Sequence, residues 1–244
     1  MTRLNLDSTV GQWVATHPQT SRLFEASRID YCCGGGKSLG QACRDSELDP
    51  QQILAQLHDA VQAAGSEPAE NWTQTSLTAL CDHIEQTHHA YLRTELPRLT
   101  TLIAKIVDAH SEGHPELLQV QHEFAALRGE LEPHMFKEEQ VLFPAIRRLE
   151  QSESPPVFPF GTVANPIRMM EHEHDNAGNG LAQIRELTCD YCAPTDACNT
   201  YRAALDGLRE LELDLHQHIH KENSILFPRA IEHERLLSGP QGRR

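Results

Sequence analysis

Two stretches of this 244-residue chain pair a histidine with a glutamate four residues later, and both end in Leu-Phe-Pro. Residues 134–144 read HMFKEEQVLFP and residues 218–228 read HIHKENSILFP, so the copies lie 84 positions apart (218 − 134). On a helix, a spacing of four places both side chains on one face, where an imidazole and a carboxylate can bind one metal ion. The repeat therefore predicts two copies of a helical ligand pair.

A further histidine precedes each pair at a matching distance. His89 and His174 lie 85 positions apart (174 − 89), nearly the shift that separates the two pairs. In each half the chain places this histidine 45 or 44 residues before the His-x-x-x-Glu pair (134 − 89 and 218 − 174). All six polar residues continue an apolar stripe with steps of three and four, which on a helix marks the face that packs into the core. In the second helix the stripe runs through Phe124, Leu127, Leu131, His134, Glu138, Val141 and Ala145.

Burial of these side chains predicts a metal site. A charged carboxylate in a protein core costs several kcal/mol unless it is paired or bound to a metal. Four imidazoles and two carboxylates at the centre of a four-helix bundle suit two borderline metal ions, with each glutamate bridging both ions. Zinc favours closed tetrahedral sites, so we expect iron, with manganese as the alternative. The expected ligands are His89, His134, Glu138, His174, His218 and Glu222.

The elements that must position these ligands are four long helices, expected near 75–110, 115–150, 165–189 and 196–234. Strand signals are scarce, and clusters of proline, serine and glycine separate the helical segments. The predicted fold is all-α: an antiparallel four-helix bundle with a small helical domain before it. We expect the small domain at 1–65, a linker at 66–74 that includes SEPAEN (66–71), and the bundle at 75–244.

Composition excludes several classes of partner. The formal charge of −14 opposes binding to nucleic acid or to an anionic membrane surface. The chain has no apolar run near the roughly 20 residues of a membrane span and no signal-peptide pattern at its start. Seven cysteines are an odd number and too few for a disulfide scaffold, so we expect reduced thiols and a cytoplasmic location.

Several motifs together resemble a known family. The His-x-x-x-Glu order with its Leu-Phe-Pro tails, EHEHD at 171–175 and DYCCGGGKSL at 30–39 are similar to the Repair of Iron Centres (RIC, ScdA/YtfE-type) family, whose bundle is hemerythrin-like. The resemblance covers nearly the whole chain. It implies an oxo- and carboxylate-bridged pair of Fe ions, and repair of iron–sulfur clusters damaged by nitrosative or oxidative stress, by iron donation, nitric oxide reduction or both.

The resemblance also implies roles around the metal pair. Each iron would keep an open position for nitric oxide or dioxygen, and nitric oxide reductase activity is one of the possible outcomes. Glu130 and Glu173 are candidates for handling protons or attracting departing iron. Cys32 and Cys33, in an expected exposed loop, are candidates for holding iron or nitric oxide or for exchanging electrons. Iron–sulfur proteins are the expected clients, and a homodimer is plausible.

The sequence is also compatible with an alternative function, and it contains several weaker signals. The alternative is a hemerythrin-type protein that binds or senses dioxygen or nitric oxide without turnover. Cys189-x-x-Cys192 followed by Cys198 resembles half of a zinc site, but surface thiols are the favoured interpretation. Pro133 should kink the second helix. The histidines expected on the surface from their helix phase are His83, His88, His172, His216 and His220.

Overall fold

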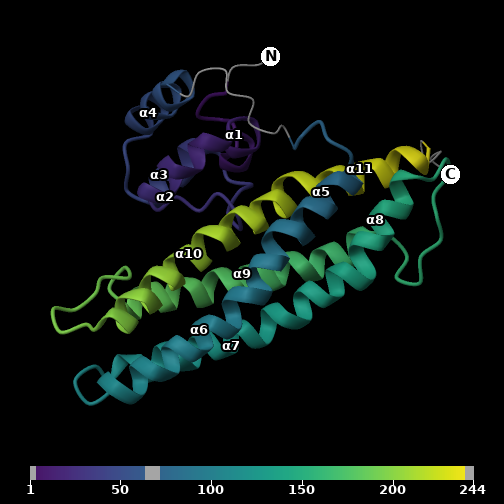
Figure 1. Cartoon of the computed structure of the whole chain (residues 1–244). Coiled ribbons are helices and arrows are strands. Elements are labelled where there is room, and N and C mark those ends of the chain that lie inside the picture. The colour runs from purple at the N-terminus through teal and green to yellow at the C-terminus, as the bar shows by residue number, and fades with distance from the viewer. Residues whose placement is uncertain (1–3, 64–71, 240–244) are drawn as a thin grey trace. The chain divides into compact units, whose positions relative to one another are not determined.

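The computed structural model describes residues 4–63 and 72–239. Within these ranges the chain forms helices and two isolated β-bridges, and it contains no strand, which confirms the all-α prediction (Figure 1). The expected linker at 66–74 lies mostly outside the described residues. Residues 1–3 of the expected small domain and residues 240–244 of the expected bundle also lie outside them. None of the helices that the structure describes is both long enough and apolar enough to cross a bilayer.

The chain forms two compact units, and each unit combines segments that are separated in the sequence. One unit comprises Cys81–Arg148 and Val157–Leu215. The other comprises the described residues of Met1–Leu80, Leu149–Pro156 and His216–Arg244.

The expected helices form within a few residues of their predicted ends. Three of the four segments contain a π-helical turn: η2 in the first half of the first segment, η3 in the second half of the second segment and η4 in the second half of the last segment. The four helical segments are α5 (Leu77–Ile84), η2 (Glu85–His89) and α6 (Ala90–His110); α7 (Glu116–Lys137), η3 (Glu138–Leu142) and α8 (Phe143–Glu150); α9 (Ala164–Leu187); and α10 (Asn199–Lys221), η4 (Glu222–Leu226) and α11 (Phe227–Leu237).

Apolar side chains from α6, α7, α9 and α10 share one core inside the unit that contains most of these helices. Leu92 and Leu99 of α6, Phe124 of α7, Leu181 of α9 and Leu211 of α10 are all buried in it. Each helix contributes the face that the apolar stripe predicted, since residues three and four apart lie above one another. The four-helix prediction is confirmed in this core.

The prediction that Val141 lies in the core is wrong, and the π turn η3 explains why. Val141 is 44% exposed, whereas its neighbour Leu142 is buried. In η3 the N–H of Phe143 donates to the carbonyl of Glu138, five residues back, so this turn contains one residue more than an α-helical turn. The extra residue rotates the following side chains, and the buried face passes from position 141 to position 142.

The prolines of the Leu-Phe-Pro motifs account for two of the π turns. A proline has no N–H, and its ring collides with the carbonyl four residues earlier in a regular α-helix. Pro144 and Pro228 lie two residues after the ends of η3 and η4, and in each case the phenylalanine before the proline donates its N–H to the carbonyl of the glutamate that begins the turn. By contrast, Pro133 lies inside α7, which continues through it to Lys137.

Four short helices form the small N-terminal core: α1 (Val10–Thr16), α2 (Ser21–Ala26), α3 (Leu39–Asp45) and α4 (Pro50–Ala63). A capping box fixes the start of α1, where Thr9 and Gln12 each accept a backbone N–H of the other residue. Trp13, Phe24 and Leu57 are buried in this core. The segment is helical and small, as predicted, and its loop 27–38 carries the adjacent cysteines.

Candidate metal centre

All six residues expected to bind metal are buried. Each has an exposed fraction of 3% or less, and both carboxylates are fully inaccessible to solvent. Their positions on the helices are related to the π turns: His89 ends η2, Glu138 begins η3 and Glu222 begins η4. His134, His174 and His218 lie in α7, α9 and α10.

The two halves of the sequence repeat build the same local geometry. His134 Nε2 lies 3.3 Å from Glu138 Oε2, and His218 Nε2 lies 3.3 Å from Glu222 Oε1. His89 Nε2 approaches Glu138 Oε2 at the same distance of 3.3 Å. The Nε2 atoms of His134 and His174 are 3.2 Å apart. In each of these contacts it is the Nε2 atom that faces the other polar groups.

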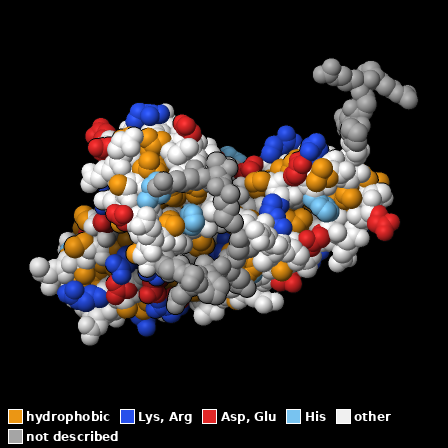
Figure 2. Space-filling model, turned by 90° about the horizontal axis from the view of Figure 1, so that it is seen from above, with side chains coloured by type: hydrophobic (Ala, Val, Ile, Leu, Met, Phe, Trp, Pro, Cys, Tyr) orange, Lys and Arg blue, Asp and Glu red, His pale blue; other side chains and the backbone are white. Residues whose placement is uncertain are grey.

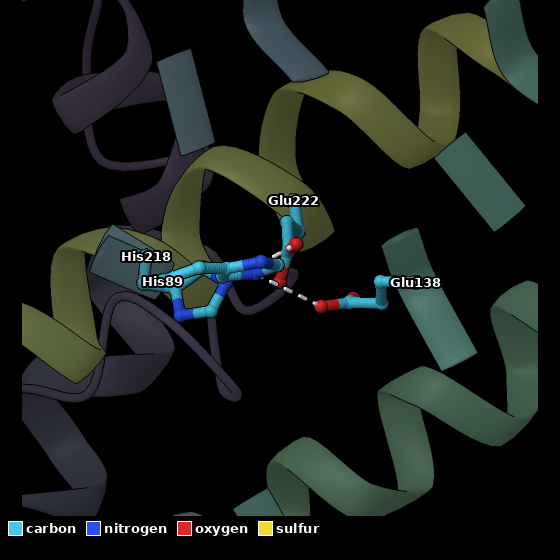
Figure 3. Close-up of side chains that lie close together, drawn as sticks. All are labelled: His89, Glu138, His218 and Glu222. Carbon is cyan, nitrogen blue, oxygen red and sulfur yellow. Dashed lines mark ion pairs between the residues drawn. The ribbon is translucent and has the colours of Figure 1, made fainter. Parts of the chain in front are cut away.

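Two groups of four side chains have ligand atoms close enough to surround a metal ion. One is His89, Glu138, His218 and Glu222, and the other is His134, Glu138, His174 and Glu222. Within each group the ligand atoms lie within 4.8 Å of one another. Figure 3 shows the first group, with the imidazoles of His89 and His218 and the carboxylate of Glu222 gathered opposite Glu138. Both glutamates belong to both groups, whereas each histidine belongs to one.

This donor set fits a pair of divalent cations. Two carboxylates without solvent exposure are costly in a protein interior unless positive charge lies beside them. Two cations shared by Glu138 and Glu222 would supply that charge, and each would have two imidazole nitrogens and oxygens from both carboxylates as ligands. Nitrogen and oxygen donors without thiolate favour borderline first-row metals over soft ones.

Carboxylates behind two of the histidines fix which ring nitrogen faces the centre. Glu139 Oε1 lies 2.7 Å from His89 Nδ1, and Glu173 Oε2 lies 2.9 Å from His134 Nδ1. A carboxylate only accepts hydrogen bonds, so each Nδ1 carries the proton and donates it, which leaves the Nε2 lone pair for a metal. Arg93 donates in turn to Glu139.

Glu173 remains ionised beside His134. Partial burial acts to raise the pKa of Glu173, but hydrogen bonds from Lys137 and His134 outweigh it and hold this pKa below its ordinary value. The sequence marked Glu173 as an acidic residue near the site, and the structure places it against a predicted ligand. Glu139 was missed, because nothing in the sequence distinguishes it from an ordinary surface glutamate on a helix.

Two flanking histidines that we expected on the surface are buried. His88 donates from Nδ1 to Asp214 Oδ1 at 2.9 Å, and His220 Nδ1 lies 3.4 Å from the carbonyl oxygen of Tyr31. The prediction was wrong because it allowed each helix a single buried face, whereas contacts with Asp214 and Tyr31 bury these two histidines outside that face. Burial lowers the pKa of His220 to about 4.

The other three flanking histidines are more accessible. His172 is exposed, as predicted, and His83 and His216 are half-buried. Of the adjacent histidines His88 and His89, His89 belongs to a group of side chains that could hold a metal ion. Glu130 is exposed on α7, and its suggested role in proton handling stays a prediction.

The adjacent cysteines differ from the exposed pair that the sequence suggested. Cys32 is buried and Cys33 is half-buried, with their Sγ atoms 3.9 Å apart as free thiols. A hydrogen bond with Cys33, burial and the nearby Asp30 carboxylate raise the pKa of Cys32 well above its ordinary value. Asp30 also holds the loop together by accepting the backbone N–H groups of Cys32, Cys33 and Gly34.

The cysteine loop contacts the turn of helix that begins with Glu222. Asn223 Nδ2 donates to the carbonyl oxygen of Cys32 at 3.5 Å. A β-carbon on Gly35 would lie 2.7 Å from the Tyr31 carbonyl oxygen and 3.0 Å from Ser224 Oγ, so this position has no room for a side chain. The glycine after the cysteines therefore allows the loop to approach η4 closely.

Comparison with known proteins divides the chain between two family models. Residues 6–61 match the ScdA N-terminal domain, described as a domain of unknown function, DUF542. Residues 82–230 match the hemerythrin HHE cation binding domain. The second match includes all six residues of the two metal groups.

Two relatives match over nearly their whole length. The chain is 36% identical over 230 residues to the iron–sulfur cluster repair protein YtfE of Yersinia pseudotuberculosis serotype IB (strain PB1/+), a match that covers 93% of this chain and 98% of that protein. The YtfE protein of Yersinia pestis (strain Pestoides F) matches with the same identity and the same coverage.

Proposed function

We propose that this chain, which belongs to the YtfE family of iron–sulfur cluster repair proteins, binds two iron ions and repairs iron–sulfur clusters damaged by nitrosative or oxidative stress. The observation that carries the proposal is the sharing of Glu138 and Glu222 by two four-residue groups, each completed by two histidines. A single metal ion would need only one such group. The match to a cation-binding domain over residues 82–230 supports the same assignment.

The residues of the chain would divide the work as follows. Glu138 and Glu222 would bridge the ions and offset their charge, His89 and His218 would complete one site, and His134 with His174 would complete the other. Glu139 would hold the ring of His89, so that Nε2 keeps facing the centre. A ferrous pair bound here would supply electrons and open coordination positions to a small ligand such as nitric oxide.

The proposal includes iron that leaves the site as cargo for a damaged cluster. In that case Glu173, a half-buried carboxylate that is hydrogen-bonded to His134 and Lys137, would handle a proton or attract the departing iron. Cys32, whose loop contacts η4, would assist transfer or electron exchange. Iron–sulfur proteins would be the clients. The homodimer, the cytoplasmic location and the division into domains at 1–65 and 75–244 stay predictions.

Metal analysis of the variants tests the shared-carboxylate arrangement. We expect two coupled irons per chain by Mössbauer spectroscopy, and the loss of both in Glu138→Leu, because that carboxylate serves both groups. His174→Ala should mainly affect one iron, since His174 belongs to one group. His172→Ala, an exposed histidine two residues away, is the matched control. One iron per chain, or zinc, or full iron content in Glu138→Leu would contradict the proposal.

An activity assay separates repair from gas binding. The iron-loaded protein is mixed with an iron–sulfur enzyme inactivated by nitric oxide, and recovery of that enzyme is followed together with the iron content of both proteins. We expect recovery with the native chain and none with Glu138→Leu. Reversible binding of dioxygen or nitric oxide, with unchanged iron content and no recovery, would instead favour the hemerythrin-type alternative.

A further inference from the structure

A second group of reactive side chains lies around the start of α10. We name it the Cys198 cluster and define it as His110, His114, Asp196, Cys198 and Tyr201. None of these residues belongs to the metal groups, and all of them lie inside one compact unit. The proposed function uses none of them.

Cys198 is held by a histidine and by a helix start. His110 Nε2 lies 3.3 Å from Cys198 Sγ, and the Cys198 carbonyl oxygen accepts the N–H of Arg202 in the first turn of the 23-residue helix α10. The hydrogen bond from His110, followed by those from the backbone N–H groups of Tyr201 and Thr200, lowers the pKa of Cys198 to about 7. A nearby histidine and a helix N-terminus are both surroundings that stabilise a thiolate.

Hydrogen bonds and ring packing hold the two histidines of the Cys198 cluster in place. His114 Nε2 lies 3.1 Å from both carboxylate oxygens of Asp196, and His114 Nδ1 lies 3.0 Å from Glu116 Oε1. These two hydrogen bonds raise the pKa of His114 and favour its charged form. The ring of Tyr201 packs against the rings of both His110 and His114, with centroids 5.3 Å and 5.7 Å apart. Tyr201 thus connects His110, which contacts Cys198 Sγ, with His114.

Solvent exposure distinguishes Cys198 from Cys32 and Cys33 of the N-terminal loop. Cys198 is exposed, whereas Cys32 is buried and its pKa is raised. A sulfur that attacks a disulfide must be both ionised and accessible, and the best attacking thiols have a pKa near the surrounding pH. Cys189 and Cys192 are also exposed, but neither has the histidine contact that Cys198 has with His110.

We propose that Cys198 is a thiol–disulfide exchange site for low-molecular-weight disulfides, with His110 as its positioning residue. The Cys198 thiolate attacks one sulfur of the small disulfide, a new sulfur–sulfur bond forms, and the other half leaves as a thiolate. One disulfide is consumed and one mixed disulfide is formed, so the step needs no other oxidant. A small thiol reverses it by the same exchange.

The test uses the full-length, metal-loaded protein and oxidised glutathione as the probe. After a short exposure, peptide mass spectrometry locates the mixed disulfide, and the rate is measured from pH 5 to 10. We expect modification first at Cys198, with a rate that rises with pH through a midpoint near 7, because the thiolate forms above that pH. Cys198→Ser should remove this fast phase, and Cys192→Ser, the matched exposed cysteine, should keep it.

The role of His110 has its own readout. If His110→Ala returned the pKa from about 7 to about 9, the thiolate fraction at pH 7 would fall about 50-fold, while the more basic sulfur would be roughly eightfold more nucleophilic. We therefore expect a rate at pH 7 lower by up to about sixfold, with the midpoint moved upward. Thermal unfolding of the variant checks that it folds.

Three results would overturn the proposal. The first is modification of Cys189 or Cys192 as fast as Cys198. The second is a midpoint near 9 in the native protein, a measurement that needs no variant at all. The third is a folded His110→Ala protein with unchanged rate and midpoint. None of these measurements depends on iron binding or on cluster repair, so failure here is separate from failure of the proposed function.

Discussion

Removal of the carboxylate behind His89 should weaken metal binding without removing a ligand. Glu139 Oε1 accepts the Nδ1 proton of His89 at 2.7 Å and so keeps Nε2 directed at the metal groups. Loss of such an outer partner typically costs about 10- to 100-fold in metal affinity, equivalent to roughly 1.4–2.7 kcal/mol. We expect this loss in Glu139→Ala. Glu139→Gln keeps an acceptor oxygen but loses the charge, so it should lose less than Glu139→Ala.

The affinity is best measured by competition. Full-length protein and a chromophoric iron(II) chelator are mixed without oxygen, and the chelator absorbance reports how the metal divides between them. Glu132→Ala is the matched control, because Glu132 is an exposed glutamate on α7 that pairs only locally with Arg128, and the charge change is the same. An affinity of Glu139→Ala within about twofold of native would refute the reasoning, since outer-partner losses are larger than that.

The analogous carboxylate provides an internal repetition of the experiment. Glu173 contacts His134 Nδ1 at 2.9 Å, in the same relation that Glu139 has to His89. Glu173→Ala should therefore weaken metal binding by a similar factor. If Glu173→Ala weakens binding and Glu139→Ala does not, the hydrogen bond to His89 contributes nothing, and the two halves of the centre are less alike than their distances indicate.

Three further predictions concern stability. Glu150→Ala should destabilise the fold by about 1–2 kcal/mol in thermal unfolding, because Glu150 accepts the N–H groups of Leu77 and Thr78 at the start of α5 at 2.6 Å and 2.9 Å. Burial acts to raise the pKa of Glu150, but these hydrogen bonds outweigh it and lower that pKa. The stabilisation by Glu150 is therefore present above the unfolded-state pKa near 4.5 and is lost as the pH falls through the lower folded-state pKa. The Tm difference between native protein and Glu150→Ala should be smaller at pH 3 than at pH 7. Leu142→Ala should cost about 2–5 kcal/mol in urea unfolding and Val141→Ala under about 0.5 kcal/mol, and equal costs would disprove the phase shift at η3. Gly35→Ala should cost about 1–3 kcal/mol, since its β-carbon meets a backbone oxygen that cannot move aside, and an unchanged Tm would count against that close approach.

The ligand set could be predicted from the sequence because it combines two strong regularities. A repeat at 84 or 85 positions related the two halves, and the three-and-four spacing of apolar residues located the buried face of each helix. His134, Glu138, His218 and Glu222 followed directly from the repeated pair. Their burial in the structure agrees with that prediction, because core position depends on helix phase, which local sequence determines.

The prediction of buried faces from residue spacing failed where the number of residues per helical turn changes. It assumed 3.6 residues per turn throughout, so it could not anticipate the π turn that exposes Val141 and buries Leu142. The Leu-Phe-Pro motifs contain the prolines that follow η3 and η4, but a proline in a helix does not by itself predict a π turn before it. Likewise, His88 and His220 were placed on the surface because a second covered face on a helix leaves no clear periodic signal.

Surface chemistry was also hidden from the sequence. The space-filling view shows charged, histidine and hydrophobic side chains mixed over the visible face (Figure 2). On such a surface the residue type alone does not separate a functional glutamate or cysteine from an ordinary one. Glu139 matters because His89 lies behind it, 50 positions away in the chain. Cys198 is notable because His110 lies beside it, 88 positions away.

The sequence by itself determined the helices, the main buried face of each and the six polar residues predicted at the centre of the bundle. These follow from spacing along the chain, which is a local property of a helix. Tertiary structure decided which carboxylate orients which imidazole, which cysteine is buried and which is exposed beside a histidine. Those relations depend on side chains tens of residues apart meeting at a few ångströms, and no local pattern in the chain records such a meeting.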